Sequence, residues 1–235
     1  MLTRSTVAPG LALVATLALS QPVVAQAPAG LQEKLAAAKQ SAAHNQQVLR
    51  AYSWIEKTEL SFKGEVKNTK LESCRFGPDG KVQKTLLSDP PPPAEKKRGL
   101  RGRIVEKKTG EMKKELESAA ALAHKYVPPD PDLMQVVIGA GKASLAQQGA
   151  GSVALKFPDY QKAGDALTLT FDTNVKALSA IDVATYLDDP ASPVTLQVQM
   201  ASLPDARYPG SITLAIPASH LQVQITKSNY QRVAP

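Results

Sequence analysis

Residues 89–126 read DPPPPAEKKRGLRGRIVEKKTGEMKKELESAAALAHKY, and they separate two parts of the chain that both show the alternating pattern of β-strands. The proline run predicts an extended, stiff segment. The residues after it are strongly basic, with nine Lys or Arg and three Asp or Glu between positions 95 and 114. Apolar residues then recur at helical spacing, which predicts a helix from about Arg103 to Lys125. This stretch therefore looks like a long insertion between two parts of one sheet.

Before the insertion, the sequence predicts a three-stranded meander. The expected strands are Arg50–Phe62, Glu65–Phe76 and Lys81–Leu87. The first of them alternates between apolar and polar residues, although Ile55 and Glu56 break the pattern in the way a bulge would. Gly77-Pro78-Asp79-Gly80 joins the last two strands and has the residues that a tight turn prefers.

After the insertion, the pattern changes from helix to strand. Pro131 suits the first turn of a second central helix. From Ser152 onward, apolar residues occupy every second position in six segments separated by turn residues. The outer faces of these strands are polar, as shown by Thr168, Thr170, Gln197, Gln199, Gln222 and Gln224. The opposite faces are aliphatic and must be covered by other parts of the chain.

Together these segments predict an α+β fold. We expect a curved antiparallel sheet, or half-open β-barrel, of about nine strands. An N-terminal helix over residues 30–49 and the central helices would cover its concave face. The pattern leaves open whether the interior is fully packed or contains a cavity.

The N-terminus has the order of a secretory signal peptide. Arg4 is the one charge before Glu33, Leu11–Leu19 is a short apolar core, and small residues around Ala25 suit a signal peptidase. The apolar core is too short to span a bilayer, and a short N-terminal anchor is the alternative. We expect residues 1–25 to be removed, which leaves residues 26–235 as a single β-rich domain in the periplasm or outside the cell. The insertion would span residues 89–145 of that domain.

The charge and the single cysteine restrict the function classes. The formal net charge is +7, and a local basic patch favours an anionic membrane surface, another anionic envelope polymer or an acidic partner. Nucleic acid is not favoured, because no nucleic-acid motif is present. Cys74 is the only cysteine, so a disulfide-pinned domain is excluded. Its place in the alternation predicts a buried thiol, and a reactive or intermolecularly bonded thiol is the alternative.

No motif in the sequence predicts catalysis, a metal site or a cofactor. The three histidines, His44, His124 and His220, have no ligand-type neighbours at metal-binding spacing. Asp188-Asp189 precedes a proline and indicates a hairpin turn rather than a catalytic pair. Residues 139–144 resemble a phosphate loop superficially. Val136 stands where the first glycine of such a loop is needed, and Ala143 stands where its Ser or Thr is needed. We therefore predict a non-catalytic protein and keep a hydrolase as the third hypothesis.

Two sets of residues are candidates for binding. The first would line an apolar concavity and contains Tyr52, Trp54, Leu60, Phe62, Met112 and Leu116. Core packing is the alternative interpretation of the two aromatic residues. The second set would meet an anionic partner and contains Lys96, Lys97, Arg98, Arg101 and Arg103. A solvated linker is the alternative for this set.

The order of these features resembles the periplasmic lipoprotein carriers of the Lol type. The resemblance rests on an exported chain with an N-terminal helix, a strand with Tyr52 and Trp54, the turn Gly77-Pro78-Asp79-Gly80-Lys81, central helices and a strand-rich second half. It is architectural and spans most of the mature chain. It implies a half-open antiparallel barrel that holds acyl chains in its concavity, with helices as a lid.

The chain is also similar to uncharacterised exported bacterial proteins that share the stretches Tyr-Ser-Trp…Glu-Lys-Thr-Glu, at residues 52–59, and Gly-Leu-Arg-Gly-Arg-Ile-Val-Glu-Lys-Lys, at residues 99–108. The leading hypothesis is binding of an acyl-bearing ligand, either a lipid or a lipoprotein. The alternative is an envelope scaffold with a packed core that acts through its basic loop. The oligomeric state stays open.

Overall fold

The computed structural model describes residues 29–87 and 100–233, which form an α+β fold with one large antiparallel sheet. The helices are α1 (Ala29–Leu49), α2 (Leu100–Ala123) and α3 (Pro131–Gly139), with a short 3₁₀ helix, η1 (Pro217–Ser219). The strands are β1 (Tyr52–Phe62), β2 (Glu65–Phe76), β3 (Val82–Leu86), β4 (Ser144–Gln147), β5 (Ser152–Pro158), β6 (Ala166–Asp172), β7 (Ala177–Tyr186), β8 (Pro193–Ser202), β9 (Arg207–Ile216) and β10 (Leu221–Arg232).

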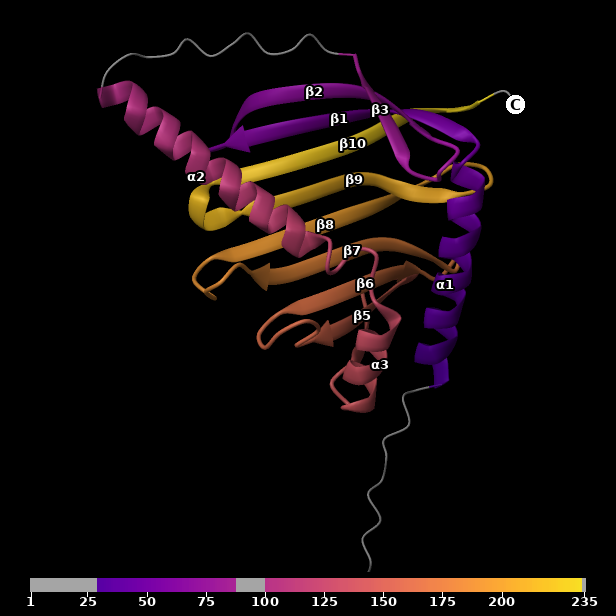
Figure 1. The fold of residues 1–235 in the computed structure, drawn as a ribbon. Helices are drawn as coiled ribbons and strands as arrows, with labels where there is room; N and C mark the ends of the chain where they lie inside the picture. Colours follow the sequence, from indigo (N-terminus) through magenta and orange to yellow (C-terminus); the bar gives the residue numbers. More distant parts are fainter. Residues whose placement is uncertain (1–28, 88–99, 234–235) are drawn as a thin grey trace, which may run out of the picture.

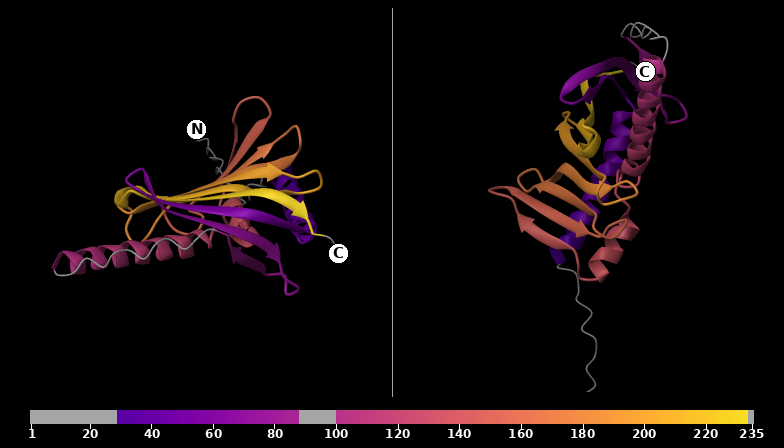
Figure 2. Two further views of the ribbon diagram at one scale, coloured as in Figure 1. Left: turned by 90° about the horizontal axis from the view of Figure 1, so that it is seen from above. Right: turned by 90° about the vertical axis from the view of Figure 1, so that its left-hand side faces the viewer.

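The strand order is β3-β2-β1-β10-β9-β8-β7-β6-β5-β4. Strands β1 to β3 form one antiparallel meander, and strands β4 to β10 form another. The pairing of β1 with β10 joins the two meanders. The sheet curves without closing, and α2 and α3 lie on its concave face (Figures 1 and 2). The predicted half-open barrel is therefore confirmed, with ten strands where about nine were expected. The strand that the sequence did not predict is β4, whose four residues are too few to show a clear alternation.

The turns of the first meander follow from residues that tolerate positive φ. Lys63 and Gly64 connect β1 to β2 with φ of 54° and 78°, which suits the twist of a tight hairpin. Gly80 has φ of 75°, and its N–H donates to the carbonyl of Gly77 at 2.9 Å. The side chain of Asp79 accepts from the N–H of Lys81 at 3.0 Å. This turn was correctly predicted from the sequence.

The bulge expected at Ile55 and Glu56 is instead on the neighbouring strand. Between the pairs Ser53–Gln231 and Ile55–Ser228, β10 contains one more residue than β1. Asn229 lies in this interval with φ of 53°, a conformation that asparagine tolerates well. Because β1 itself is regular here, Glu56 lies on the inner face of the sheet, where it is buried together with Trp54.

The helices follow the predicted segments with small shifts at their ends. The central helix begins at Leu100 and ends at Ala123, whereas Arg103 and Lys125 were expected. Helix α3 starts with Pro131, and its N-cap Asp130 accepts from the N–H of Asp132 at 2.9 Å. Among residues 29–87 and 100–233, no helix is long and apolar enough to cross a membrane. The residues predicted as a signal peptide, the proline run and Lys96, Lys97 and Arg98 lie outside the described residues.

Helix α3 closes one end of the concave face. Its buried residues Met134, Val137 and Ile138 pack into the main apolar core. The sheet contributes the inner-face residues of β5 to β9 to this core, among them Phe157 and Leu167, which are fully buried. This part of the molecule is therefore filled with side chains. Helix α1 lies beside the start of β9, where the side chain of Asn45 accepts from the N–H of Arg207 at 3.0 Å (Figure 1).

Candidate functional site

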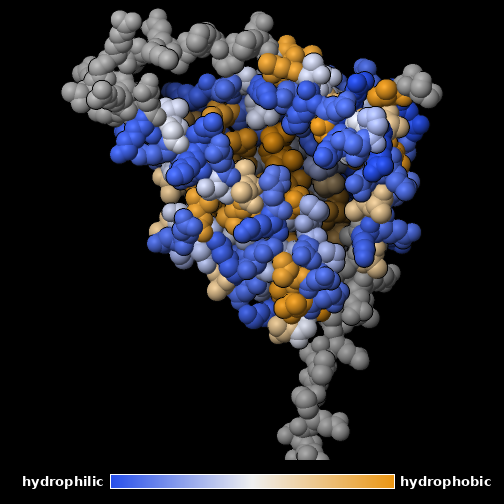
Figure 3. Space-filling model, in the orientation of Figure 1, coloured by the Kyte–Doolittle hydropathy of each residue, from blue (hydrophilic) through white to orange (hydrophobic). Residues whose placement is uncertain are grey.

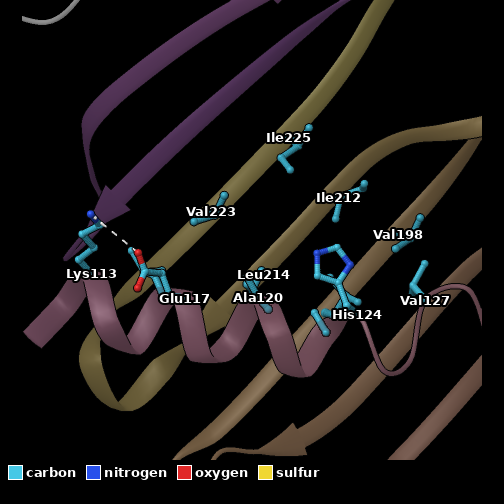
Figure 4. A pocket seen from close by; sticks show the side chains of 13 residues that line it. Lys113, Glu117, Ala120, His124, Val127, Val198, Ile212, Leu214, Val223 and Ile225 are labelled. Atoms are coloured by element: carbon cyan, nitrogen blue, oxygen red, sulfur yellow. Dashed lines mark ion pairs between the residues drawn. The ribbon is translucent and has the colours of Figure 1, made fainter. Parts of the chain in front are cut away.

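A groove with a volume of about 440 Å³ runs between α2 and strands β8, β9 and β10. Its floor consists of Leu196, Val198, Ile212, Leu214, Val223 and Ile225. Its other wall comes from α2 and the segment after it, with Leu116, Ala120, Ala123 and Val127 (Figure 4). Three polar residues, Lys113, Glu117 and His124, complete the lining and are exposed. The groove is thus apolar along its length and polar at its rim.

Two of the three apolar α2 side chains that face the groove, those of Ala120 and Ala123, are short. Leu116, Ala120 and Ala123 are spaced by four and three residues, so they share one side of the helix. An alanine side chain is a single methyl group and does not fill the space between a helix and a sheet. Figure 3 shows the resulting hollow in the surface between α2 and α1, with hydrophobic side chains at its floor.

Helix α2 is held most firmly at its C-terminal end. Tyr126, which follows the helix, is fully buried, and its O–H donates to Asp165 at 2.5 Å and lies 2.8 Å from the hydroxyl of Thr185. Burial and the bond to Asp165 raise the pKa of Tyr126 above its ordinary value. Earlier in the helix, Glu115 accepts from the hydroxyl of Ser219 at 2.5 Å. These bonds position α2 over the sheet while leaving the groove beside it open.

Beyond the groove, the floor continues into a group of aromatic residues. Trp54 stacks on Tyr230, with ring centroids 5.5 Å apart and planes at 10°, and Tyr208 lies 4.1 Å from Tyr230. The indole N–H of Trp54 is buried and has no hydrogen-bond partner among the described residues. Tyr52 lies at the end of the group and donates to Asp205 at 2.9 Å. The inner face of the sheet is therefore aromatic near the start of β1 and the end of β10.

Next to the aromatic group is a charged cluster, which we define as Glu56, Lys70, Glu72, Lys84 and Lys227. It lies on the inner face, because the strand registers place Glu56 opposite both Lys227 and Glu72, and Lys84 opposite the buried Cys74. The two carboxylates are only 5% and 6% exposed. Buried charges are costly unless they are paired, and each of these carboxylates has a lysine partner.

Lysines from β2 and β3 neutralise these carboxylates. The ammonium of Lys84 contacts Glu56 and lies 3.8 Å from Glu72, and that of Lys70 lies 2.6 Å from Glu72. Burial acts against the charge on Lys84, but the hydrogen bond and the charge of Glu56 prevail and raise its pKa. Cys74, which lies between these groups, has a raised pKa because of burial and the nearby carboxylates. Its thiol is therefore buried and protonated at neutral pH.

The predicted apolar binding residues lie in different parts of the concave face. Leu116 lines the groove, and Met112 packs against the core from the same helix. Leu60 and Phe62 also pack partly buried against this core. Tyr52 and Trp54 belong to the aromatic group, where they are 6% and 4% exposed. Leu116 alone among the six is a lining residue of the groove.

The basic residues predicted to meet an anionic partner lie at or before the start of α2. Arg101 and Arg103 are in its first turn, and the other three precede the helix, outside the described residues. In the sequence, the charged cluster is indicated only by charged residues at inward-facing positions, most clearly Glu56, which interrupts an apolar face. The floor residues of the groove were predicted as inner-face residues, although nothing in their pattern distinguishes a groove from a core.

Metal binding has no support in the described part of the chain. There, no three or more His, Cys, Asp or Glu side chains are grouped so that they could hold a metal ion. The three histidines are exposed. Asp189 lies in a turn, in which its side chain accepts from the N–H of Ala191 at 2.7 Å.

Comparison with solved structures finds a distant similarity. The chain is similar to a DUF1329 family protein from Desulfovibrio piger ATCC 29098, with a TM-score of 0.42, 12% sequence identity and coverage of 86% of this chain and 92% of that chain. No family model matches the chain, and no curated protein matches it. The similarity assigns neither a family nor a function. It also does not connect the chain with the lipoprotein carriers, so that resemblance stays a hypothesis.

Proposed function

We propose that this protein is exported and binds an acyl-bearing ligand, a lipid or a lipoprotein, without catalysing a reaction. The observation that carries the proposal is the apolar groove between α2 and β8–β10. Its volume of about 440 Å³ is within the range of about 300 to 1,000 Å³ that is usual for small-molecule sites. Its floor, formed by the strands, offers no hydrogen-bonding side chain, which suits a hydrocarbon chain better than a polar substrate.

Binding would be driven by removal of the acyl chain from water. Each buried methylene contributes about 0.8 kcal/mol, so a chain of moderate length is sufficient for stable binding. In this proposal α2 acts as a lid that moves about its anchored end at Tyr126. The basic residues at the start of α2 and before it would meet an anionic membrane surface or envelope polymer. A scaffold with a packed core, the alternative hypothesis, requires no groove.

The first test is native mass spectrometry of the protein taken from its own cell envelope without detergent, followed by solvent extraction and lipid analysis. We expect an acyl species to co-purify at about one per chain. If the protein carries none, and also takes up none when lipid is added back, the proposal is wrong and the scaffold becomes the better hypothesis.

A matched pair of variants tests whether the groove is the site. Ala120→Phe places a ring in the groove, and Ala121→Phe places the same ring on the exposed side of the same helix. We expect Ala120→Phe to weaken binding of dodecanoate by about tenfold, because the space lost corresponds to about two methylenes. Ala121→Phe should bind as the parent protein does. Equal binding by both variants would place the acyl chain elsewhere.

A further inference from the structure

The charged cluster contains one more ammonium group than its carboxylates neutralise. It has three lysines and two glutamates, and the close contacts of Glu56 and Glu72 are to Lys84 and Lys70. The remaining lysine, Lys227, has its Nζ 4.0 Å from Glu56 Oε2, which is too far for a hydrogen bond. No hydrogen bond from this Nζ to another described residue is formed. Lys227 is therefore the surplus cation of the cluster.

Lys227 is partly buried, and its ammonium makes no hydrogen bond to the described residues. Its side chain is 19% exposed, and partial removal of an ammonium from water without a compensating hydrogen bond is unfavourable. Burial lowers the pKa of Lys227, and the charge of Lys84 acts in the same direction, whereas the charge of Glu56 opposes it. The Trp54 ring is the other close neighbour, with its centroid 5.8 Å from Nζ. An anion beside Nζ would supply the missing hydrogen bonds and bring the cluster to neutrality.

Lys227 lies directly beyond the groove on the same face of the same strand. Val223 and Ile225 of β10 line the groove, and Lys227 is the next residue of β10 that faces inward, opposite Glu56. Two residues along a strand span about 7 Å. An amphiphile whose chain lies in the groove can thus reach Lys227 with its polar end.

The other charged end of the groove offers no comparable site. Lys113 and Glu117 of α2 form an ion pair of 3.8 Å (Figure 4). Their side chains are 77% and 66% exposed, so water already solvates both charges. Lys227 is the less hydrated of the two lysines, and its only ion pair among the described residues is the 4.0 Å contact with Glu56, which Lys84 also contacts.

We propose that Lys227 binds the anionic head of the acyl ligand, a carboxylate or phosphate, while the acyl chain occupies the groove. This inference rests on the proposed function and makes it more specific, because it assigns the ligand class to anionic amphiphiles. It also places the head inside the concavity rather than at the basic residues before α2.

The test compares amphiphiles that share a twelve-carbon chain. Dodecanoate, dodecyl phosphate and dodecanol are added to delipidated protein below their micelle concentrations, and their affinities are measured by displacement of the neutral probe N-phenyl-1-naphthylamine. We expect the two anions to bind about tenfold more tightly than dodecanol, because the free energy of one hydrogen bond between charged groups corresponds to about this ratio of affinities. The preference between the two anions identifies the head as carboxylate or phosphate.

Variants of two lysines locate the head. Lys227→Met keeps an unbranched side chain and should reduce dodecanoate to the affinity of dodecanol, whereas Lys227→Arg should keep the preference for the anion. Lys57→Met, at an exposed position on the outer face of β1 and outside the groove, should leave the preference unchanged. If the preference survives Lys227→Met or disappears in Lys57→Met, the inference is wrong although the proposed function stands. Equal binding of dodecanoate and dodecanol by the parent protein would also show that the inference is wrong while the proposed function stands.

Two further outcomes concern the chain and the anion separately. If none of the three amphiphiles binds, the proposed function fails and this inference fails with it. If inorganic phosphate displaces dodecanoate as effectively as dodecyl phosphate does, Lys227 is a simple anion site and the assignment to a lipid head is overturned.

Discussion

The two ends of the concave face have similar floors and different covers. Under α3, Met134, Val137 and Ile138 pack next to β5 in the main apolar core, and the space is filled. Under α2, the equally aliphatic inner faces of β8 to β10 meet Ala120 and Ala123, and a groove remains. The sheet therefore does not decide which part becomes core and which becomes a binding site. The covering helix decides it, through its distance from the sheet and the size of the side chains that face inward.

The largest effect should come from the polar anchor of the filled region. Asp165 is 2% exposed and accepts from the O–H of Tyr126 at 2.5 Å and from the N–H of Tyr160 at 2.6 Å. Asp165→Ala leaves these buried donors without an acceptor, and we expect the free energy of unfolding to fall by about 4 kcal/mol. Urea denaturation measures the change.

The control for this anchor is Asp188→Ala, because Asp188 is exposed in a turn. It should change the free energy of unfolding by less than about 0.5 kcal/mol. If both variants unfold at the same urea concentration, the network around Asp165 does not stabilise the filled region, and the contrast between the two ends loses its polar component.

The next prediction compares the packing of α3 with the packing of α2. Ile138 of α3 is 6% exposed, and Ile138→Ala should lower the free energy of unfolding by about 3 kcal/mol because it leaves a cavity in a filled core. Leu116 of α2 lines the groove, where space is already present. Leu116→Ala should therefore lower it by about 1 kcal/mol or less. Equal losses in urea denaturation would show that α2 packs as tightly as α3.

Much of this architecture could be predicted from the sequence, because strand pairing follows from local alternation. The inward position of Leu214 and Ile216 follows from their spacing, and the turn at Gly77–Gly80 follows from its residue types. The groove could not be predicted, since the distance of α2 from the sheet depends on which side of that helix faces inward. Ala120 and Ala123 look the same in the sequence whether they permit close packing or leave a groove.

The charged cluster was missed for a different reason. Each of its members is an ordinary charged residue in a strand, although the alternation after Val223 and Ile225 places Lys227 on the inner face. Only the pairing of β1 with both β2 and β10 brings Glu56 next to Glu72 and Lys227. A charge among inward-facing apolar residues was the available signal, and at Glu56 it was interpreted as a bulge.

A smaller effect tests how far the binding region extends along the floor. Trp54 is the only tryptophan and is already 4% exposed, so a bound acyl chain should shift its emission little. A dodecanoate brominated near its head should quench this emission if the head lies beside Lys227, whose Nζ is 5.8 Å from the Trp54 ring. Bromine at the far end of the chain should quench less. Equal quenching by both isomers would contradict the proposed direction of the chain.

The smallest effect concerns the stability of the aromatic group around Trp54 and Tyr230, at the groove end of the concave face, at alkaline pH. Burial raises the pKa of Tyr230, with smaller contributions from Tyr208 and Glu56. The folded protein thus keeps this proton at pH values where the unfolded chain, with an ordinary pKa of about 10, loses it. Stability from this group is complete below about pH 10 and decreases above it.

Tyr230→Phe keeps the stacking on Trp54 and removes this titration. We expect its thermal unfolding midpoint to match that of the parent protein at pH 7 and to decrease less steeply between pH 10 and 11. Tyr126→Phe, in the filled region, should also flatten the alkaline decrease, but it should lower the midpoint at pH 7 as well, because the bond to Asp165 is lost. If Tyr230→Phe destabilises the protein at pH 7 as strongly as Tyr126→Phe, the aromatic floor is as firmly packed as the region under α3. The open end would then begin at the groove rather than at Trp54.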